Sequence, residues 1–261
     1  QGSLALLLAV SHIFSVYLWM WGFNYLRDPF FSSTNERTLS YQDVRNSMSR
    51  YALSTNQLRE QLQENEVGCV NSLDDLDVLD KDIEKQQNIV LKKLGFQPIN
   101  RTHTKKQLLS NLWLQIGSAG IYGPFTGESN VSWPIAPGLE AGLIAHERSH
   151  LFGFAKESSA EYIGLLTVLS SEAPLIRYSG WLRLWTLVEY EEAISYPLSE
   201  AVRRDLLCVA KYWNSHLGGG HETAMDVYDR LLKAQGVASG LKNYQEAITL
   251  LLLNEDHWIS P

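Results

Sequence analysis

The sequence predicts a mainly α-helical α+β fold that contains one small β element and is preceded by an N-terminal transmembrane helix. Three observations lead to this prediction. A long uncharged segment opens the chain, apolar residues recur at helical spacing through most of the remainder, and a glycine-rich aromatic stretch interrupts that spacing near the middle. With 261 residues, of which 45% are hydrophobic, the chain can form one sizeable core.

The N-terminal segment carries no charged residue before Arg27. Residues 4–21 are almost wholly apolar, and tyrosine, tryptophan and phenylalanine side chains gather at the end of this run. A charge-free apolar segment of this length, closed by aromatic residues, is typical of a membrane-spanning helix. The alternative is a buried core helix, because two serines and a histidine interrupt the run. We therefore expect residues 1–27 to form a transmembrane helix and its exit from the membrane.

The remainder of the chain is predicted to form a linker and one domain. Residues 28–38 mix a proline, hydroxyl side chains and charges of both signs, so we expect a linker there and a domain over residues 39–261. Residues 112–133 combine aromatic and branched residues with several glycines and a proline, which favours short strands. Helical spacing of apolar residues occurs in eight stretches: 44–62, 73–94, 139–151, 157–169, 182–195, 199–216, 223–234 and 244–253.

Charge and cysteine content narrow the classes of function. The chain has 22 basic and 29 acidic residues, a net charge of −7, and no long basic stripe, so no nucleic acid is expected as a partner. Two cysteines, Cys69 and Cys208, are too few for a cysteine-rich zinc module. They could form one disulfide or remain two buried thiols, which leaves the redox compartment open.

One motif in the predicted helix 139–151 indicates metal chemistry. His146 and His150 are four residues apart, so they share one helical face and can chelate one ion. Glu147 lies about 100° around the helix from His146, where its carboxylate can reach a metal-bound water without binding the metal. This is the arrangement that zinc hydrolysis needs. We expect His146 and His150 to bind zinc and Glu147 to act as the general base.

Two acidic residues follow at the start of the next predicted helix. A catalytic zinc typically has three protein ligands and a water, and Glu157 is our choice for the third ligand. Glu161 follows one helical turn later, where it could accept the free ring N–H of a ligating histidine and fix its tautomer. The alternatives are that the two glutamates exchange these roles, or that both are surface carboxylates.

The motif and its surroundings resemble known proteins. The two histidines followed by Glu157 and Glu161 look like the gluzincin arrangement, which implies a zincin-like fold. More closely, the chain resembles an uncharacterised family of bacterial membrane-anchored proteins known only as a domain of unknown function. It departs from that family's usual acidic-Ala-Asn run, because Ser159 and Glu161 stand here. The matching pieces are residues 21–25, 120–128, 145–155, 177–180 and 228–233.

The resemblance suggests where substrate is held. Peptidases of this kind need a further hydrogen-bond donor for the developing oxyanion, and we rank Tyr178 before Tyr228 and His221 as that catalytic donor. The glycine-rich region around Gly123, Phe125 and Gly127 resembles the edge strand that binds extended peptide in related peptidases. An ordinary glycine-rich hairpin is the alternative.

The leading hypothesis is a zinc-dependent metallopeptidase that hydrolyses a peptide (amide) bond of a peptide or protein near a membrane surface. A cell-wall peptide as substrate would involve the same chemistry. The alternative is a membrane-tethered scaffold or interaction protein with a structural or inactive zinc site. We expect attachment to the bacterial inner membrane through the N-terminal helix, an extracytoplasmic domain, and possible partners among other membrane proteins.

Overall fold

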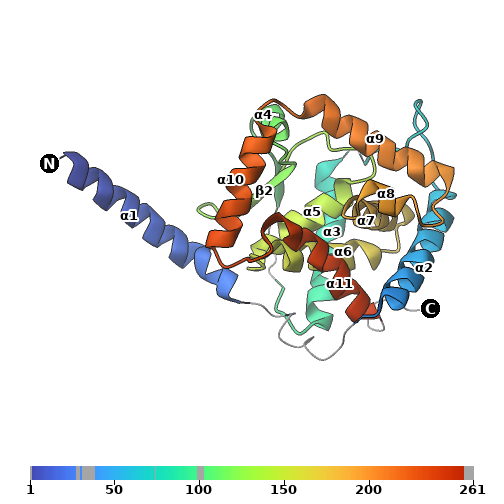
Figure 1. The fold of residues 1–261 in the computed structure, drawn as a ribbon, viewed down its shortest axis with the longest axis horizontal. Helices are drawn as coiled ribbons and strands as arrows, with labels where there is room; N and C mark the ends of the chain where they lie inside the picture. The colour runs from blue at the N-terminus through green and yellow to red at the C-terminus, as the bar shows by residue number, and fades with distance from the viewer. Residues whose placement is uncertain (1, 28–29, 31–38, 74, 99–102, 256–261) are drawn as a thin grey trace.

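The computed structural model describes the chain except residues 1, 28–29, 31–38, 74, 99–102 and 256–261 (Figure 1). Most described residues are helical and a small three-stranded sheet accompanies them, so the predicted α+β class is confirmed. The strands are β1 (Thr104–Lys106), β2 (Gly120–Gly123) and β3 (Glu128–Val131). The helices are α1 (Gly2–Met20), η1 (Gly22–Leu26), α2 (Tyr41–Arg59), α3 (Leu76–Lys93), α4 (Ser110–Gln115), α5 (Glu140–Leu151), α6 (Glu157–Leu169), α7 (Pro174–Thr186), α8 (Tyr190–Ala193), α9 (Glu200–His216), α10 (His221–Ala234), η3 (Gly240–Lys242) and α11 (Asn243–Leu253).

Helices α5 and α6 form the centre of the fold. Every residue of α6 and residues 140–150 of α5 are buried, and Figure 1 shows the two helices enclosed by α3, α7, α10 and α11. Gly164 allows their close approach, because a Cβ at this position would lie only 2.9 Å from the backbone nitrogen of His146. The helix that carries the histidine motif is therefore held directly against the helix that carries the two glutamates.

The sheet lies beside α5. Its strand order is β1-β3-β2, with β1 parallel and β2 antiparallel to β3, so β2 is an edge strand of this sheet. The predicted β element over residues 112–133 is right for β2 and β3. It is wrong at its start, which belongs to α4, and it misses β1. The error at the start arises because α4 has only six residues, too few for a helical spacing of apolar residues to be distinguished from the pattern of a strand.

One other predicted helix has different limits. The stretch 182–195 is divided between α7 and α8, and α7 begins earlier, at Pro174. Proline suits the first turn of a helix because its φ angle is already helical and its missing N–H is not needed there. Glu189 has an extended backbone (φ −54°, ψ 138°), which separates the two helices.

The N-terminal helix α1 extends away from the rest of the molecule (Figure 1). Apolar side chains on it are exposed, among them Leu6 at 67% and Ile13 at 61%. Among the described residues, no helix combines the length and the apolar character that crossing a membrane requires, and this finding does not support the predicted transmembrane helix.

The segment after α1 leads into the main domain. Apart from Phe30, the predicted linker 28–38 lies outside the described residues; Phe30 itself packs on Phe154 and Tyr162, with ring centroids 5.7 and 5.2 Å away. Ser40 then caps the start of α2 through a reciprocal pair of hydrogen bonds with Asp43.

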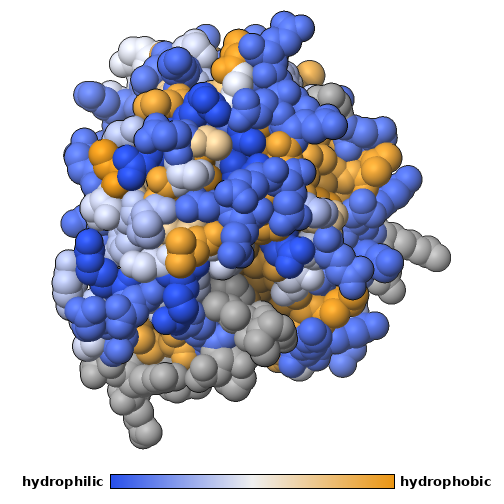
Figure 2. All heavy atoms as spheres, turned by 90° about the vertical axis from the view of Figure 1, so that its right-hand side faces the viewer, coloured by the Kyte–Doolittle hydropathy of each residue, from blue (hydrophilic) through white to orange (hydrophobic). Residues whose placement is uncertain are grey.

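The side of the molecule opposite α1, formed in part by α2 and α9, presents a mostly hydrophilic face with separate apolar patches (Figure 2).

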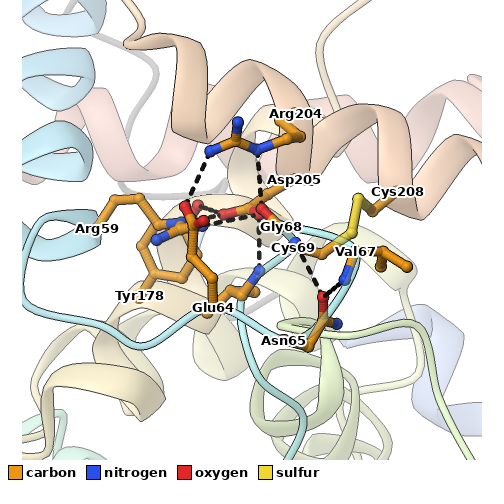
Figure 3. Close-up of a disulfide and its surroundings, with 11 residues drawn as sticks. Arg59, Glu64, Asn65, Val67, Gly68, Cys69, Tyr178, Arg204, Asp205 and Cys208 are labelled. Carbon is orange, nitrogen blue, oxygen red and sulfur yellow. Dashed lines mark hydrogen bonds and ion pairs between the residues drawn. A yellow bond between two sulfur atoms is a disulfide. The ribbon is translucent and has the colours of Figure 1, made fainter.

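A buried charge cluster joins α2, α7 and α9 (Figure 3). Asp205 of α9 accepts hydrogen bonds from Arg59 Nε and the Tyr178 hydroxyl, each at 2.5 Å, and from the backbone N–H of Val70 at 2.8 Å. Beside it, a disulfide between Cys69 and Cys208 joins the loop after α2 to α9. The pairing that the sequence left open is thus present in the structure.

We predict that Asp205→Ala lowers the free energy of unfolding by about 3 to 5 kcal/mol, because it removes the buried carboxylate that pairs with the Arg59 guanidinium and leaves only the more exposed Glu64 as a charged partner. The matched control is Asp226→Ala, which breaks an exposed ion pair with Arg230 and should cost less than about 0.5 kcal/mol. Urea unfolding followed by circular dichroism measures both. Equal losses in the two variants would contradict the assigned importance of the buried cluster.

Candidate metal centre

Three predicted ligands converge between α5 and α6. Oε2 of Glu157 lies 3.1 Å from Nε2 of His146 and 3.6 Å from Nε2 of His150. One ligand atom from each residue lies within 4.8 Å of the others, and all three side chains are buried. Two imidazole nitrogens and one carboxylate oxygen are a donor set that zinc accepts, and three protein ligands leave one position for water. The residues therefore fit a zinc ion.

Neighbouring groups fix the orientation of both histidine rings. Nδ1 of His150 lies 2.7 Å from the carbonyl oxygen of Phe154, which is brought back toward the ring because Gly153, in the turn after α5, has a left-handed φ of +84°. Nδ1 of His146 lies 2.9 Å from Oε2 of Glu161. When Nδ1 donates a hydrogen bond in each ring, Nε2 is left free to bind a metal.

Glu161 is in turn held by an arginine from α7. Arg183 donates from Nε and Nη2 to the two carboxylate oxygens of Glu161, at 2.8 and 2.7 Å. Burial acts to raise the pKa of Glu161, but Arg183 and His146 outweigh it and lower this pKa to about 2. Glu161 is therefore ionised, accepts two hydrogen bonds from Arg183 and lies within ion-pair distance of His146. This position matches its predicted role behind His146.

The electrostatic balance of the centre favours a cation. Glu147, Glu157 and Glu161 are all buried within a few ångströms of the histidines. Burial acts to lower the pKa of His146, but the neighbouring carboxylates, Glu161 foremost, raise it to about 10. Without a metal, His146 therefore carries a proton that partly neutralises the carboxylates, and a bound dication would supply that positive charge instead.

Glu147 lies on the side of the centre that faces the sheet. A Cβ at Gly120 of β2 would lie 2.3 Å from Oε1 of Glu147, so a side chain at position 120 would displace this carboxylate from its place beside the strand. Burial raises the pKa of Glu147, although both histidines act to lower it. A carboxylate with a raised pKa and no place in the ligand set is suited to accept a proton.

Two tyrosines from the C-terminal helices complete the centre. The Tyr228 hydroxyl of α10 donates to Oε1 of Glu157 at 2.5 Å, which leaves Oε2 directed at the histidines. The Tyr244 ring of α11 stacks on His146 with a centroid distance of 5.7 Å. Sequence reasoning named Tyr228 only as a second choice and missed Tyr244 altogether. Neither tyrosine lies in a motif with the ligands, so spacing alone carries no signal for it.

The structure does not bring Tyr178 to the ligands. Its side chain is fully buried, and its hydroxyl donates to Asp205 beside Arg59 (Figure 3). Arg183 of the same helix does reach the centre, and five residues correspond to about 140° around a helix. Tyr178 therefore points to a different face of α7, and its predicted catalytic role is corrected to a structural one. His221 packs instead against Ile116.

The predicted substrate-binding residues lie at the turn of the hairpin. Gly123 accepts a hydrogen bond from the backbone N–H of Gly127, and Phe125 at the tip is 51% exposed. Tyr122, which precedes Gly123, has its ring centroid 6.1 Å from that of His150, and at the start of β2 an added Cβ on Gly120 would meet Glu147. The sequence thus identified the strand beside the centre but chose Gly123 and the turn residues after it instead of Gly120 and Tyr122.

The centre and the fold together define a candidate metal site built on two buried helices. The chain belongs to a family described as "protein of unknown function (DUF3810)", whose model matches residues 1–252. The predicted resemblance to a family known only as a domain of unknown function is therefore confirmed. No curated protein and no solved structure matches the chain.

We predict that the purified protein retains about one zinc ion per chain, as one site with three protein ligands implies. His146→Ala and His150→Ala should each abolish this retention, measured by elemental analysis after dialysis. His103→Ala is the control, because its ring is 66% exposed and lies outside the centre. Protein that takes up no metal even after zinc is added would contradict the assignment.

We also predict that Glu161→Gln weakens zinc affinity about 10- to 100-fold, because a lost partner of a ligating histidine has that effect. Arg183→Met should act in the same direction through Glu161, whereas Arg203→Met, which removes an arginine that hydrogen-bonds only backbone carbonyls elsewhere, should not. Competition with a fluorescent zinc chelator measures all three. If Glu161→Gln removes the metal entirely and Glu157→Gln does not, the two glutamates have exchanged roles.

Proposed function

We propose that this protein is a zinc-dependent metallopeptidase of the gluzincin type with a zincin-like fold. The observation that carries the proposal is the division of roles among four buried residues. His146, His150 and Glu157 direct ligand atoms at one point, and Glu147 lies beside them without a place in the ligand set. A structural zinc site is normally closed by four protein ligands and does not need such a carboxylate.

The chain's own residues would then perform the proton transfers. A zinc ion held by the three ligands would supply Lewis acidity and lower the pKa of a bound water toward about 7. Glu147 accepts the proton from the attacking water and later delivers it to the leaving amine. Tyr228 holds one oxygen of Glu157 so that the other stays directed at the metal position, and Glu161 keeps the His146 ring oriented.

The proposed substrate is a peptide or protein in extended conformation. The edge strand β2 has one side that pairs with β3, and an extended chain could pair with its other side. Gly120 would bring that chain close to Glu147, since no side chain separates this strand from the carboxylate. A cell-wall peptide would meet the same geometry.

The proposed location is the extracytoplasmic side of the bacterial inner membrane. The Cys69–Cys208 disulfide supports an oxidising compartment, because such bonds persist in secreted and periplasmic proteins. The exposed apolar side chains of α1 support attachment to the membrane, where other membrane proteins could be partners or substrates.

The competing proposal is a membrane-tethered scaffold with a structural or inactive metal site. Deep burial favours it, since Glu147 is only 5% exposed and the ligands are 3 to 6% exposed. Glu147 itself favours the enzyme, because a scaffold has no need for a proton acceptor beside its metal.

Variants of two glutamates distinguish the proposals. Glu147→Gln should keep zinc, since Glu147 is not a ligand, but should lower the rate of hydrolysis of a fluorogenic casein by about 10²- to 10⁴-fold because the water loses its proton acceptor. Glu157→Gln should weaken zinc retention directly. If the wild type binds zinc and Glu147→Gln leaves its hydrolysis unchanged, or if no hydrolysis is found, the scaffold is favoured.

A further inference from the structure

The candidate centre is covered by the chain's own residues 21–25, which we call the cover segment. Trp21 is 6% exposed, and its ring centroid lies 5.8 Å from that of His150 and 4.2 Å from that of Tyr122. Trp21 thus contacts both the metal-binding helix α5 and the edge strand β2. This is the space that an extended substrate would need in order to pair with β2 beside the ligands.

Other residues of the segment extend the cover. Tyr25 packs edge-to-face on Trp21 and interacts electrostatically with Glu157. Asn24 lies against Gly153 at the end of α5, where an added Cβ would be 3.3 Å from its Oδ1 atom. Together these contacts place the segment over both His150 and Glu157.

The way the segment is attached allows it to move. Its backbone hydrogen bonds run from Trp21 to Tyr17, from Asn24 to Trp21 and from Arg27 to Asn24, all within the same stretch of chain. Among the described residues, its contacts with the main domain are therefore side-chain contacts. Within that part of the chain, a shift of the segment would break no backbone hydrogen bond to the main domain.

We propose that the cover segment is a displaceable lid: it closes the substrate cleft of the metal centre, and its position is set by α1, with which it is continuous. The inference rests on the proposed function, because a closed cleft has a consequence only if the centre is catalytic. With the lid seated, the ligands are nearly inaccessible and a polypeptide cannot lie along β2. Movement of α1 relative to the domain would open the cleft, so activity would be regulated where the chain leaves α1.

The first experiment measures access to His150 in the metal-free chain of residues 1–261. Diethyl pyrocarbonate modifies exposed imidazoles, and peptide mass spectrometry gives the rate at each histidine, with exposed His103 as the internal reference. Trp21→Ala should raise the rate at His150 by about 10- to 100-fold, because loss of a buried large apolar side chain weakens the closed state by that factor. Leu6→Ala is the control, because Leu6 lies on α1 outside the cover segment and is 67% exposed, so its removal should leave the rate unchanged.

The second experiment separates a moving lid from a fixed wall. The side chains of Tyr17 and Gln235 form a hydrogen bond between α1 and α10. Tyr17→Cys and Gln235→Cys, joined by a short bismaleimide, should hold the segment in place; the two native cysteines are already paired. Cross-linking should slow modification of His150 relative to the uncross-linked double variant. An equal rate with and without the cross-link would show a fixed wall and overturn the inference, even if Trp21→Ala unfolds the protein.

The rate of His150 modification is measured without metal, so the lid inference and the proposed function can be tested independently. Suppose that the protein binds zinc and hydrolyses substrate, but neither Trp21→Ala nor the cross-link changes the reactivity of His150. That result would overturn the lid and leave the proposed function intact. Reactivity that responds to both changes, in a protein that never binds zinc, would overturn the proposed function while retaining a mobile cover over the cluster.

Discussion

The close packing of α5 against α6 is the constraint on which the centre depends. Gly164 supplies the clearance, since any side chain there would press on the backbone of His146. Glu157, Glu161 and Gly164 follow the spacing i, i+4, i+7, so they form one stripe along α6. The same stripe thus places two carboxylates beside the histidines and, at Gly164, lacks the side chain that would hold the two helices apart.

The packing of α5 against α6 buries several carboxylates, and neighbouring side chains neutralise or hydrogen-bond only some of them. Buried carboxylates are costly unless they are paired and hydrogen-bonded. Arg183 neutralises Glu161 through two hydrogen bonds, and Tyr228 donates to Glu157. A proton on His146 balances part of the remaining negative charge when no metal is bound, because the neighbouring carboxylates raise the pKa of this histidine. A metal that bound His146 would have to displace that proton.

The sequence predicted the features whose parts are close together in the chain. The two histidines and Glu147 are related by helical spacing within α5, and Glu157 opens the next helix only a few residues later, so both relations can be read without a structure. Trp21, Arg183 and Tyr244 come from distant segments, and only tertiary packing brings them to the centre. Tyr178 was misassigned because the phase of α7 was unknown: the helix begins at Pro174, outside the predicted limits, and its period directs Arg183 rather than the tyrosine at the ligands.

The position of Trp21 joins α1 and the candidate centre into one physical unit. A natural way to prepare the domain alone is to cut the chain after Arg27 and so discard the exposed apolar helix. That cut would also remove the indole that covers His150 and the aromatic contact on Tyr122. The shortened protein would lack the contacts that cover His150 and Tyr122, so its behaviour toward metal and solvent would differ from that of a chain that retains α1.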